Sequence, residues 1–373
     1  MRNTKKKVAI VYDWVDKWGG VERVLLHLHS LLPDADFYTS AVDPIGAAWA
    51  QKIQMNRSFI QSIPLFFRRK RASILPFYPF AFESMDFGAY DTVISITSAF
   101  AKGIITRPNT RHICYLLTPP RYLWSHTDEY LSPTMKILAA PLLSHLKQWD
   151  KKAAMRPDKY ISISQTVANR AAVIYGVSSD VLFPPFDTVY WDKQKNESKK
   201  NRYTIPKTPY FLWVGRMEQY KKVELVCDVA RQSPSRTFVF VGTGGLEAQL
   251  RRSAPKNCLF MGLISDEQLS LLYTYAQALI MPQNEDFGYV SLEAQYHGCP
   301  VIAYQSGGAI ETVQAGVTGL FFKQQSTSSL IAVLESFDQI SYNLRRSTVV
   351  QKNELLRRFG VERFNKQFII HFQ

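Results

Sequence analysis

Short apolar runs alternate with helical patterns along most of this chain, in two separate series. The first series begins with the apolar run at residues 8–14, followed by helical spacing of apolar residues over 21–32. The second begins at residues 210–215 and continues with a helical pattern over 223–231. Alternating strands and helices predict βαβ units with parallel sheets. Because 373 residues exceed one ordinary core, we expect an α/β protein of two doubly wound, Rossmann-like domains that face each other.

The domain boundaries are expected at the polar stretch between the two series. Residues 187–209 contain several lysines and few apolar residues, and they follow Pro184-Pro185. We therefore predict an N-terminal domain over 1–186, a linker over 187–209 and a C-terminal domain over 210–355. A series of apolar residues near the C-terminus predicts a last helix over 356–373, packed back on the N-terminal domain.

Composition restricts the class of protein further. An apolar content of 46% and a charged content of 20% are typical of an ordered globular protein. The four cysteines are scattered and no His/Asp/Glu/Cys set has metal-ligand spacing, so we expect a reducing compartment and no bound metal. No apolar stretch approaches the ~20 residues of a membrane span. The prediction is a cytoplasmic protein that is soluble or peripheral on the inner face of the plasma membrane.

The net charge of +14 is distributed unevenly. No acidic residue lies between Asp43 and Glu83, whereas Arg68, Arg69, Lys70 and Arg71 fall there among phenylalanines, in a segment that has no clear strand or helix pattern. Basic residues next to aromatic ones suit an anionic membrane surface, a lipid-phosphate acceptor or nucleic acid. We favour the membrane over nucleic acid; a solvated basic face beside a local core is the simpler alternative.

The strongest candidate site lies between Glu285 and Glu293. The apolar run at 278–283 predicts a buried strand that leads to Glu285, and residues 289–296 predict a helix that ends at His297-Gly298. Backbone N–H groups at a helix start favour an anion, and the two carboxylates can accept hydrogen bonds from hydroxyl groups. The pattern therefore suits a phosphorylated sugar. A solvated capping loop with incidental acids would explain the same spacing.

Three other loops are expected at the carboxyl ends of strands, where such sheets bind ligands. Arg216 and Lys221 can converge on one diphosphate, although an exposed basic turn would look the same in sequence. Gly19-Gly20 and Gly307-Gly308 allow the backbone to approach a ligand, but each can also be a simple turn. Together, these loops predict a cleft between the two domains.

Read together, these motifs resemble the family 4 retaining glycosyltransferases, which have two facing Rossmann-like domains. The similarity is greatest to the mannosyltransferase branch of O-antigen and exopolysaccharide assembly. It extends almost from end to end, over the following stretches: Asp13-Trp14 with Gly19-Gly20-Val21-Glu22-Arg23, Thr118-Pro119-Pro120-Arg121, Gly215-Arg216 with Lys221, Glu285-Asp286-Phe287-Gly288 with Glu293, and Gly307-Gly308-Ala309.

The resemblance implies transfer of a hexose from a nucleotide sugar to a glycan or lipid-linked acceptor, without metal or other cofactor. Mannose from GDP-mannose is favoured, and UDP-sugars remain the alternative. Arg216 and Lys221 would bind the diphosphate, and Glu285 would contact the sugar. The implied donor-binding residues are Gly19, Gly20, Leu263, Phe287, Gly288, Tyr289 and Glu293. Among these, Glu293 would hold the ribose hydroxyls, and the loop around Leu263 would hold the base.

One position departs from the pattern. The branch commonly carries His immediately before the Thr that corresponds to Thr118, and this chain has Leu117 there. His112 and His126 lie nearby and are candidates for a site role, although a lone His is more often structural. The departure leaves open a catalytically silent scaffold or binding member of the fold. An epimerase or phosphorylase is disfavoured by the Glu285/Glu293 pattern.

Overall fold

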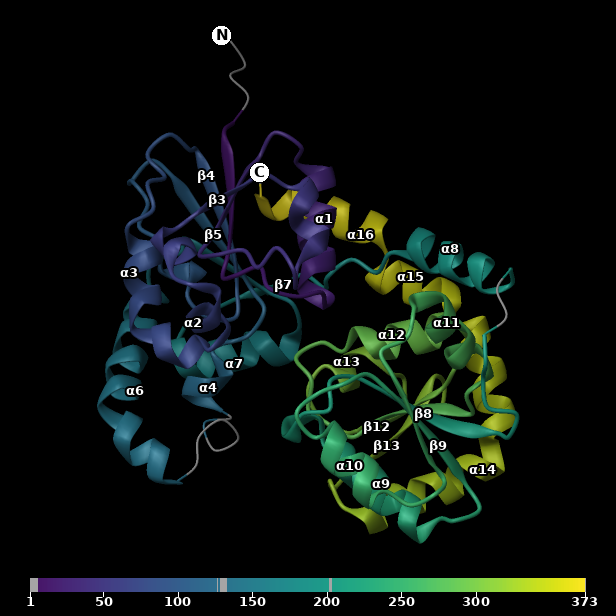
Figure 1. Cartoon of the computed structure of the whole chain (residues 1–373). Helices are drawn as coiled ribbons and strands as arrows, with labels where there is room; N and C mark the ends of the chain where they lie inside the picture. The colour runs from purple at the N-terminus through teal and green to yellow at the C-terminus, as the bar shows by residue number, and fades with distance from the viewer. Residues whose placement is uncertain (1–5, 126, 128–132, 201–202, 373) are drawn as a thin grey trace. The chain divides into compact units, whose positions relative to one another are not determined.

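A computed structural model describes residues 6–125, 127, 133–200 and 203–372 of the chain. The chain divides into two compact units, the first comprising Met1–Pro184 with Asn365–Gln373 and the second Pro185–Phe364. Each unit is built on a parallel sheet with helices packed against it (Figure 1). The predicted class, two doubly wound α/β domains, is therefore confirmed.

The first unit contains a 7-stranded sheet in the order β3-β2-β1-β4-β5-β6-β7, in which all neighbours pair in parallel. The inner strands are almost entirely buried, as expected where helices cover both faces, although β4 and β5 also bury polar side chains such as Ser95 and His112. The strands are β1 (Val8–Tyr12), β2 (Asp36–Thr39), β3 (Met55–Arg57), β4 (Thr92–Thr97), β5 (Arg111–Leu116), β6 (Lys159–Ser162) and β7 (Asp180–Val181).

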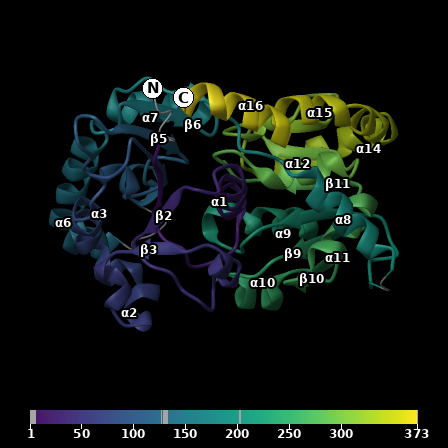
Figure 2. The same ribbon diagram turned by 90° about the horizontal axis from the view of Figure 1, so that it is seen from above.

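The helices of the first unit include several short ones in the segment that showed no clear pattern. That segment also supplies the edge strand β3, which is too short to leave a periodic signal. Helices α3 and α6 lie side by side (Figures 1 and 2), and Trp149 Nε1 of α6 donates to Glu83 Oε1 of α3 at 2.7 Å. The helices are α1 (Gly20–Leu31), α2 (Leu65–Arg69), α3 (Tyr78–Glu83), α4 (Arg121–Trp124), α6 (Pro133–Ala153) and α7 (Gln165–Tyr175), with 3-10 turns η1 (Ala48–Lys52), η2 (Phe59–Ser62), η3 (Arg71–Phe77) and η4 (Ala101–Gly103).

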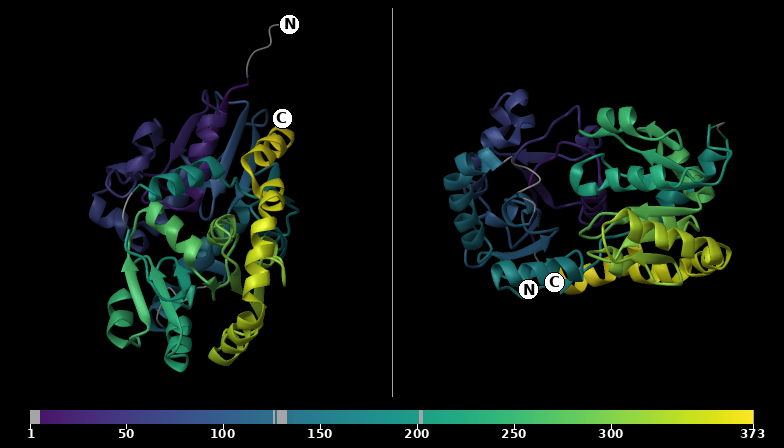
Figure 3. Two further views of the ribbon diagram at one scale, coloured as in Figure 1. Left: turned by 90° about the vertical axis from the view of Figure 1, so that its right-hand side faces the viewer. Right: turned by 90° about the horizontal axis from the view of Figure 1, so that it is seen from below.

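The second unit contains a 6-stranded parallel sheet in the order β10-β9-β8-β11-β12-β13. Its strands are β8 (Tyr210–Val214), β9 (Thr237–Val241), β10 (Cys258–Gly262), β11 (Ala278–Met281), β12 (Val301–Tyr304) and β13 (Gly319–Phe322). The main helices are α8 (Thr188–Ser198), α9 (Val223–Gln232), α10 (Glu247–Ser253), α11 (Asp266–Tyr275), α12 (Tyr289–Tyr296), α13 (Ala309–Thr312), α14 (Thr327–Val350) and α15 (Lys352–Phe359). Helices α14 and α15 follow one another along this unit (yellow, Figure 3).

The structure differs from the sequence-based boundaries in two places. Residues 187–209 are predicted to be a linker, yet they include α8, which begins at the Asp187 cap and belongs to the second unit. Trp191 of α8 is only 1% exposed, and its ring packs against Tyr273 with centroids 6.2 Å apart. A single buried tryptophan in a polar helix of 11 residues leaves too weak an apolar pattern to predict.

The second difference concerns the C-terminus, where one helix over 356–373 is expected. Instead, α15 ends at Phe359 and α16 runs over Val361–Phe372. Residues 365–372 of α16 belong to the first unit, in which Asn365 Oδ1 lies 2.6 Å from His27 Nε2. His371 Nδ1 also lies 3.1 Å from Lys159 Nζ of β6.

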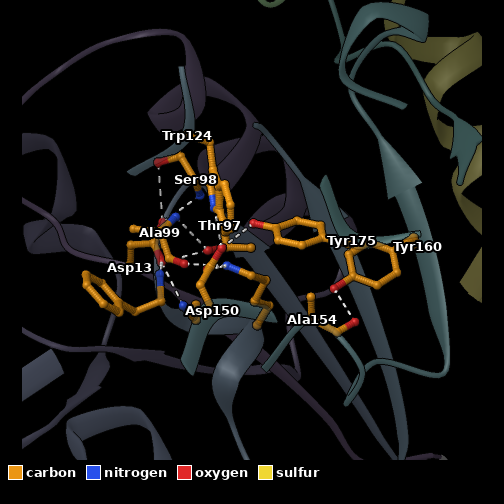
Figure 4. A network of polar contacts seen from close by, with 12 residues as sticks. Asp13, Thr97, Ser98, Ala99, Trp124, Asp150, Ala154, Tyr160 and Tyr175 are labelled. Carbon is orange, nitrogen blue, oxygen red and sulfur yellow. Dashed lines mark hydrogen bonds and ion pairs between the residues drawn. The ribbon is translucent and has the colours of Figure 1, made fainter. Parts of the chain in front are cut away.

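Two buried carboxylates organise the polar interior of the first unit (Figure 4). Asp13, which follows β1, accepts hydrogen bonds from Thr97 Oγ1 and from the backbone N–H groups of Ser98, Phe100 and Ala101, at 2.7–2.8 Å. These bonds attach the end of β1 to the loop after β4.

The second carboxylate belongs to Asp150 of α6. Its Oδ1 lies 2.5 Å from Lys102 Nζ, and the two side chains are 1% and 0% exposed. Its Oδ2 accepts hydrogen bonds from Trp124 Nε1 and Tyr175 OH, each at 2.7 Å. Asp150 therefore ties η4, α4, α6 and α7 together through one charged group.

Lys102→Met is expected to lower the free energy of unfolding of the first unit by about 3–5 kcal/mol, since it leaves the Asp150 carboxylate buried without its counter-charge. Urea unfolding followed by circular dichroism measures the change. Lys7→Met is the matched control, because Lys7 Nζ pairs with Asp36 at 3.8 Å on the surface and should contribute about 1 kcal/mol or less. Equal losses in the two variants would contradict the assignment.

Candidate functional site

The site is built on the loop between β11 and α12 in the second unit. Helix α12 covers Tyr289–Tyr296, as the sequence predicts, whereas strand β11 ends at Met281, before the predicted end at residue 283. Gly288 has a φ of 91°, a left-handed conformation that a side chain disfavours, and it turns the chain into the helix. The backbone N–H groups of the first turn of α12, which have no partner within the helix, therefore come only a few residues after Glu285.

Gly307-Gly308, after β12, holds this loop in place. Glu285 and Gly307 form an isolated parallel bridge, and Gly308 N donates to Glu285 O at 2.7 Å. A Cβ on Gly308 would lie 2.4 Å from the Cα of Phe287, closer than any real contact. Only a glycine allows this approach, so the predicted Gly-Gly turn positions the Glu285 backbone.

The Glu285 carboxylate is the central group of the site. Its Oε1 forms an ion pair with Lys221 Nζ and accepts a hydrogen bond from Gln283 Nε2 at 2.8 Å. The Lys221 and Glu285 side chains are 15% and 14% exposed. The structure therefore brings together two predicted site residues, and it adds Gln283, which the sequence patterns did not indicate.

Tyr220 brings the predicted cations Arg216 and Lys221 together. Arg216 lies in the loop after β8, and its Nη2 donates to Tyr220 OH at 2.7 Å. The guanidinium and the Lys221 ammonium lie 5.9 and 5.2 Å from the Tyr220 ring centroid, within the range of cation–π attraction. The sequence shows that Tyr220 is next to Lys221. It does not show the contact with Arg216, because that contact depends on the turn η5 (Gln219–Lys221).

Glu293 lies in α12 and is almost completely buried. Tyr273 OH of α11 donates to its Oε2 at 2.9 Å. The C-cap of α12 is His297, whose Nδ1 lies 2.7 Å from the Glu293 carbonyl oxygen and whose Nε2 lies 2.8 Å from Ser270 Oγ. Burial lowers the pKa of His297 to about 4, so the imidazole is neutral at pH 7. Because a carbonyl only accepts, Nδ1 carries the proton and Nε2 accepts from Ser270.

The remaining predicted donor-binding residues of this unit occupy different environments. Phe287 is buried, with its ring 5.3 Å from that of Tyr289 and 5.8 Å from that of Phe359, so its side chain is part of the core. Tyr289 OH donates to Pro185 O at 3.1 Å. Leu263, after β10, is 80% exposed. Only the backbone of Phe287 is thus available to contact a ligand, whereas the apolar side chain of Leu263 is exposed to solvent.

Gly19 and Gly20 belong to the first unit. Gly20 is the first residue of α1, and Gly19 caps that helix in an extended conformation with a φ of −178°. A Cβ on Gly19 would lie 2.9 Å from Glu22 Oε2. Because that oxygen is the far end of a side chain that can shift, and the backbone is extended, neither space nor backbone conformation requires glycine at position 19.

The departure at Leu117 is a core position. Leu117 is buried directly after β5, and the next side chain, Thr118, accepts a hydrogen bond at Oγ1 from Arg170 Nη1 at 2.8 Å. His112 is buried inside β5, where burial lowers its pKa to about 3 and Ser95 Oγ lies 2.8 Å from its Nε2. His112 is therefore structural, and His126 lies outside the described residues.

The four basic residues at positions 68–71 differ in their contacts. The three arginines bind other parts of the protein, whereas Lys70 lies over one exposed ring. Arg68 donates to Ile63 O and Val42 O at 2.8 and 2.9 Å, and Arg69 Nε lies 2.9 Å from Asp43 Oδ2. Arg71 pairs with Asp16 and lies over the Trp14 ring. Lys70 is exposed and lies over the ring of the exposed Phe66, 4.4 Å from its centroid. Arg68 and Arg71 thus have structural contacts that the sequence could not show.

Among the described residues, no group of three or more His, Cys, Asp or Glu side chains is arranged to hold a metal ion. Within the same part of the chain, none of the helices has the length and hydropathy required to span a bilayer.

The neutral, buried His297 predicts a pH dependence of stability in the second unit. Its folded pKa of about 4 lies below the usual 6.5, so the unfolded chain binds a proton first as the pH falls. The free energy of unfolding should therefore decrease from about pH 6.5 to about pH 4, by at most ~1.4 kcal/mol per pH unit for this group. Urea unfolding at several pH values should show a shallower decrease for His297→Gln, which cannot titrate. Identical slopes would contradict this prediction.

Comparison with known proteins finds relatives among both characterised and uncharacterised proteins. An uncharacterized 41.2 kDa protein in the cps region of Klebsiella pneumoniae is 23% identical over 323 residues, 81% of this chain and 83% of that protein. The alpha-1,3/1,6-mannosyltransferase ALG2 of Homo sapiens is 30% identical over 168 residues, 38% of this chain and 40% of that protein. A glycogen synthase of Xanthomonas campestris is 35% identical over 137 residues, 34% of this chain and 28% of that protein.

Two solved structures share the fold over nearly their whole length. Sucrose-phosphate synthase from Thermosynechococcus elongatus has a TM-score of 0.74 at 18% identity and covers 98% of both chains. Anabaena HepE in complex with UDP and glucose has a TM-score of 0.66 at 19% identity and covers 98% of this chain and 99% of its own. Residues 194–348 also match the family model of glycosyl transferases group 1. The chain therefore has the two-sheet glycosyltransferase-B type fold, and its residues 194–348 are similar to the glycosyl transferases of group 1.

Proposed function

We propose that this protein is a retaining, metal-independent hexosyltransferase that uses a nucleotide sugar in the assembly of a cell-surface polysaccharide. The observation that carries the proposal is the cluster of Arg216, Lys221 and Glu285 in the second unit. It combines two cations suited to a diphosphate with a carboxylate suited to sugar hydroxyls, next to the start of α12. The similarity to group 1 glycosyl transferases and the relative from a cps region support the polysaccharide context.

The cations would act on the leaving group. Glycosyl transfer passes through an oxocarbenium-like state while negative charge grows on the departing diphosphate. Arg216 and Lys221 are cations that would stabilise this charge, as hydrogen-bond donors and cations aimed at developing charge do in other transfer reactions. Glu285 would hold the sugar by accepting hydrogen bonds from its hydroxyl groups, and Glu293 would accept hydrogen bonds from the ribose.

For the donor, we propose GDP-mannose, and a UDP-sugar is the second candidate. The human relative is a mannosyltransferase, and an O-antigen chain mannosyltransferase C of Escherichia coli is 29% identical over 34% of this chain. In favour of UDP-sugars, the structural neighbour HepE was solved with UDP and glucose. The acceptor in the proposal is a glycan or a lipid-linked saccharide.

Lys221→Ala is expected to lower the turnover number for the nucleotide sugar about 100-fold, because it removes a charge that stabilises the leaving diphosphate. Hydrolysis of GDP-mannose and UDP-glucose by the purified protein measures this. Lys323→Ala, which removes an exposed lysine after β13, should turn over like the unaltered protein.

Binding of the donor can be measured separately by thermal shift. A nucleotide sugar at about 100 times its dissociation constant stabilises the folded state by ~2.7 kcal/mol, so the preferred donor should give the largest shift among GDP-, UDP- and ADP-sugars. Near-normal turnover by Lys221→Ala would contradict the proposed role. Binding without any turnover would instead favour the silent member of the fold.

We also propose that the first unit contacts an anionic membrane through a basic-aromatic surface, defined here as Lys52, Arg57, Arg69 and Lys70 with Phe59, Phe66, Phe67, Phe77 and Phe80. All of these side chains are exposed, and no acidic residue lies between Asp43 and Glu83. The phenyl rings of Phe66 and Phe67 pack edge to face at 5.4 Å, beside Lys70. Exposed aromatic rings beside cations match the interface of an anionic bilayer.

Lys70→Glu should weaken binding to phosphatidylglycerol vesicles about 10- to 30-fold, because each basic charge near such a surface contributes roughly 1 kcal/mol and the reversal changes the charge by two. Vesicle sedimentation measures the affinity. Phe66→Ser should also weaken it, whereas Val173→Ser, an exposed apolar residue on α7, should not. Arg68 and Arg71 are poor choices for reversal because they bind other parts of the protein. Equal binding to phosphatidylcholine vesicles would refute the proposal.

A further inference from the structure

Gln283 stands out among the buried polar groups of the second unit. It lies between β11 and Glu285 and is only 2% exposed. Its Nε2 donates to Glu285 Oε1 at 2.8 Å. The chain just before it is anchored as well, because Gln325 Nε2 donates to the carbonyl oxygen of Pro282 at 2.7 Å. The amide is thus presented to the carboxylate by a fixed backbone.

The other end of the same amide is unsatisfied. Gln283 Oε1 is buried and accepts no hydrogen bond from the residues that the structure describes. A buried acceptor without a partner is unfavourable, and an apolar side chain of the same shape would avoid that cost. Core packing therefore does not account for an amide at this position. The contact that does account for it is the one from Nε2 to Glu285.

Lys221 also contacts the carboxylate to which Gln283 donates, and this suggests what the hydrogen bond from Gln283 to Glu285 does. In the structure, Lys221 and Gln283 bind the same oxygen of Glu285. A donor diphosphate near Lys221 would compete with Glu285 for the ammonium group. If Lys221 turned toward the diphosphate, the hydrogen bond from Gln283 Nε2 would still hold the carboxylate.

We infer that Gln283 is a positioning residue, whose Nε2 keeps the Glu285 carboxylate in place for the sugar while Lys221 binds the diphosphate. This inference rests on the proposed function. Hydrogen bonds to charged groups are among the strong ones, so losing this contact should reduce kcat/KM for the nucleotide sugar about 10- to 100-fold. The effect should fall mainly on kcat, because the displaced group acts on the reacting sugar and not on the nucleotide.

Gln283→Glu tests this by pH. The charged groups that the structure places at this amide are Glu285 and, through the shared oxygen, Lys221. A carboxylic acid beside the Glu285 carboxylate has a raised pKa. Below that pKa the protonated group can donate to Glu285 in place of the amide, and above it two carboxylates repel. The ratio of kcat/KM between variant and unaltered protein should therefore rise at least tenfold from about pH 8.5 to about pH 5.5.

Gln283→Met is the matched control, because it fills a similar volume without a donor or a charge. It should lower kcat/KM by a similar factor, with the pH profile of the unaltered protein. The assay is hydrolysis of GDP-mannose and UDP-glucose, with unfolding of each variant followed in parallel. If the unaltered protein is active and both variants match it, or if the Gln283→Glu ratio does not change with pH, the inference is overturned. If the unaltered protein neither binds nor hydrolyses either nucleotide sugar, the proposed function fails and this inference fails with it.

Discussion

Parallel pairing of β8, β11 and β12 is the constraint on which the site in the second unit depends. Leu279 of β11 pairs with Val301 of β12, and Ala278 pairs with Phe211 of β8. Because parallel strands all end at the same edge of a sheet, the loops that follow them meet there. Those loops carry Arg216, Glu285 and Gly307. Arg216 and Glu285 are 69 positions apart in the chain and Glu285 and Gly307 are 22 apart, yet the sheet brings all three to one place.

Within that place, short-range packing sets the geometry of the charged groups. The bridge between Glu285 and Gly307 holds the backbone, and the close approach of Gly308 to Phe287 leaves no room for a side chain. Lys221 and Gln283 then share one carboxylate oxygen. The opposite charges of Lys221 and Glu285 neutralise each other in this arrangement. Under the proposed function, the diphosphate and the hydroxyl groups of the donor would offer each of them a new partner.

Both units contain buried titratable groups, and the two units stabilise them through different partners. In the first unit, the Asp13 carboxylate is bound by backbone N–H groups and Asp150 by Lys102, so each charge is compensated inside the fold. In the second unit, Glu293 accepts a hydrogen bond from Tyr273 OH, and burial keeps the nearby His297 neutral. Side chains of α8, α11 and α12 meet around His297, which explains how a segment expected to be a linker becomes part of the domain.

The sequence by itself determined the two α/β sheets, the strand–loop–helix at Glu285 and the presence of acids and cations at strand ends, whereas the ion pair between Lys221 and Glu285 came from the tertiary structure. These features follow from local periodicity and from glycines at positions where the backbone turns, which are properties of neighbouring residues. Only the tertiary structure decided that Trp191 is core, that β3 forms an edge strand, that Arg68 and Arg71 bind the protein, and that Gln283 reaches Glu285. Each of these depends on partners distant in sequence or on the rotamer of one side chain, and a polar residue in a loop has the same pattern whether it faces solvent or a buried carboxylate.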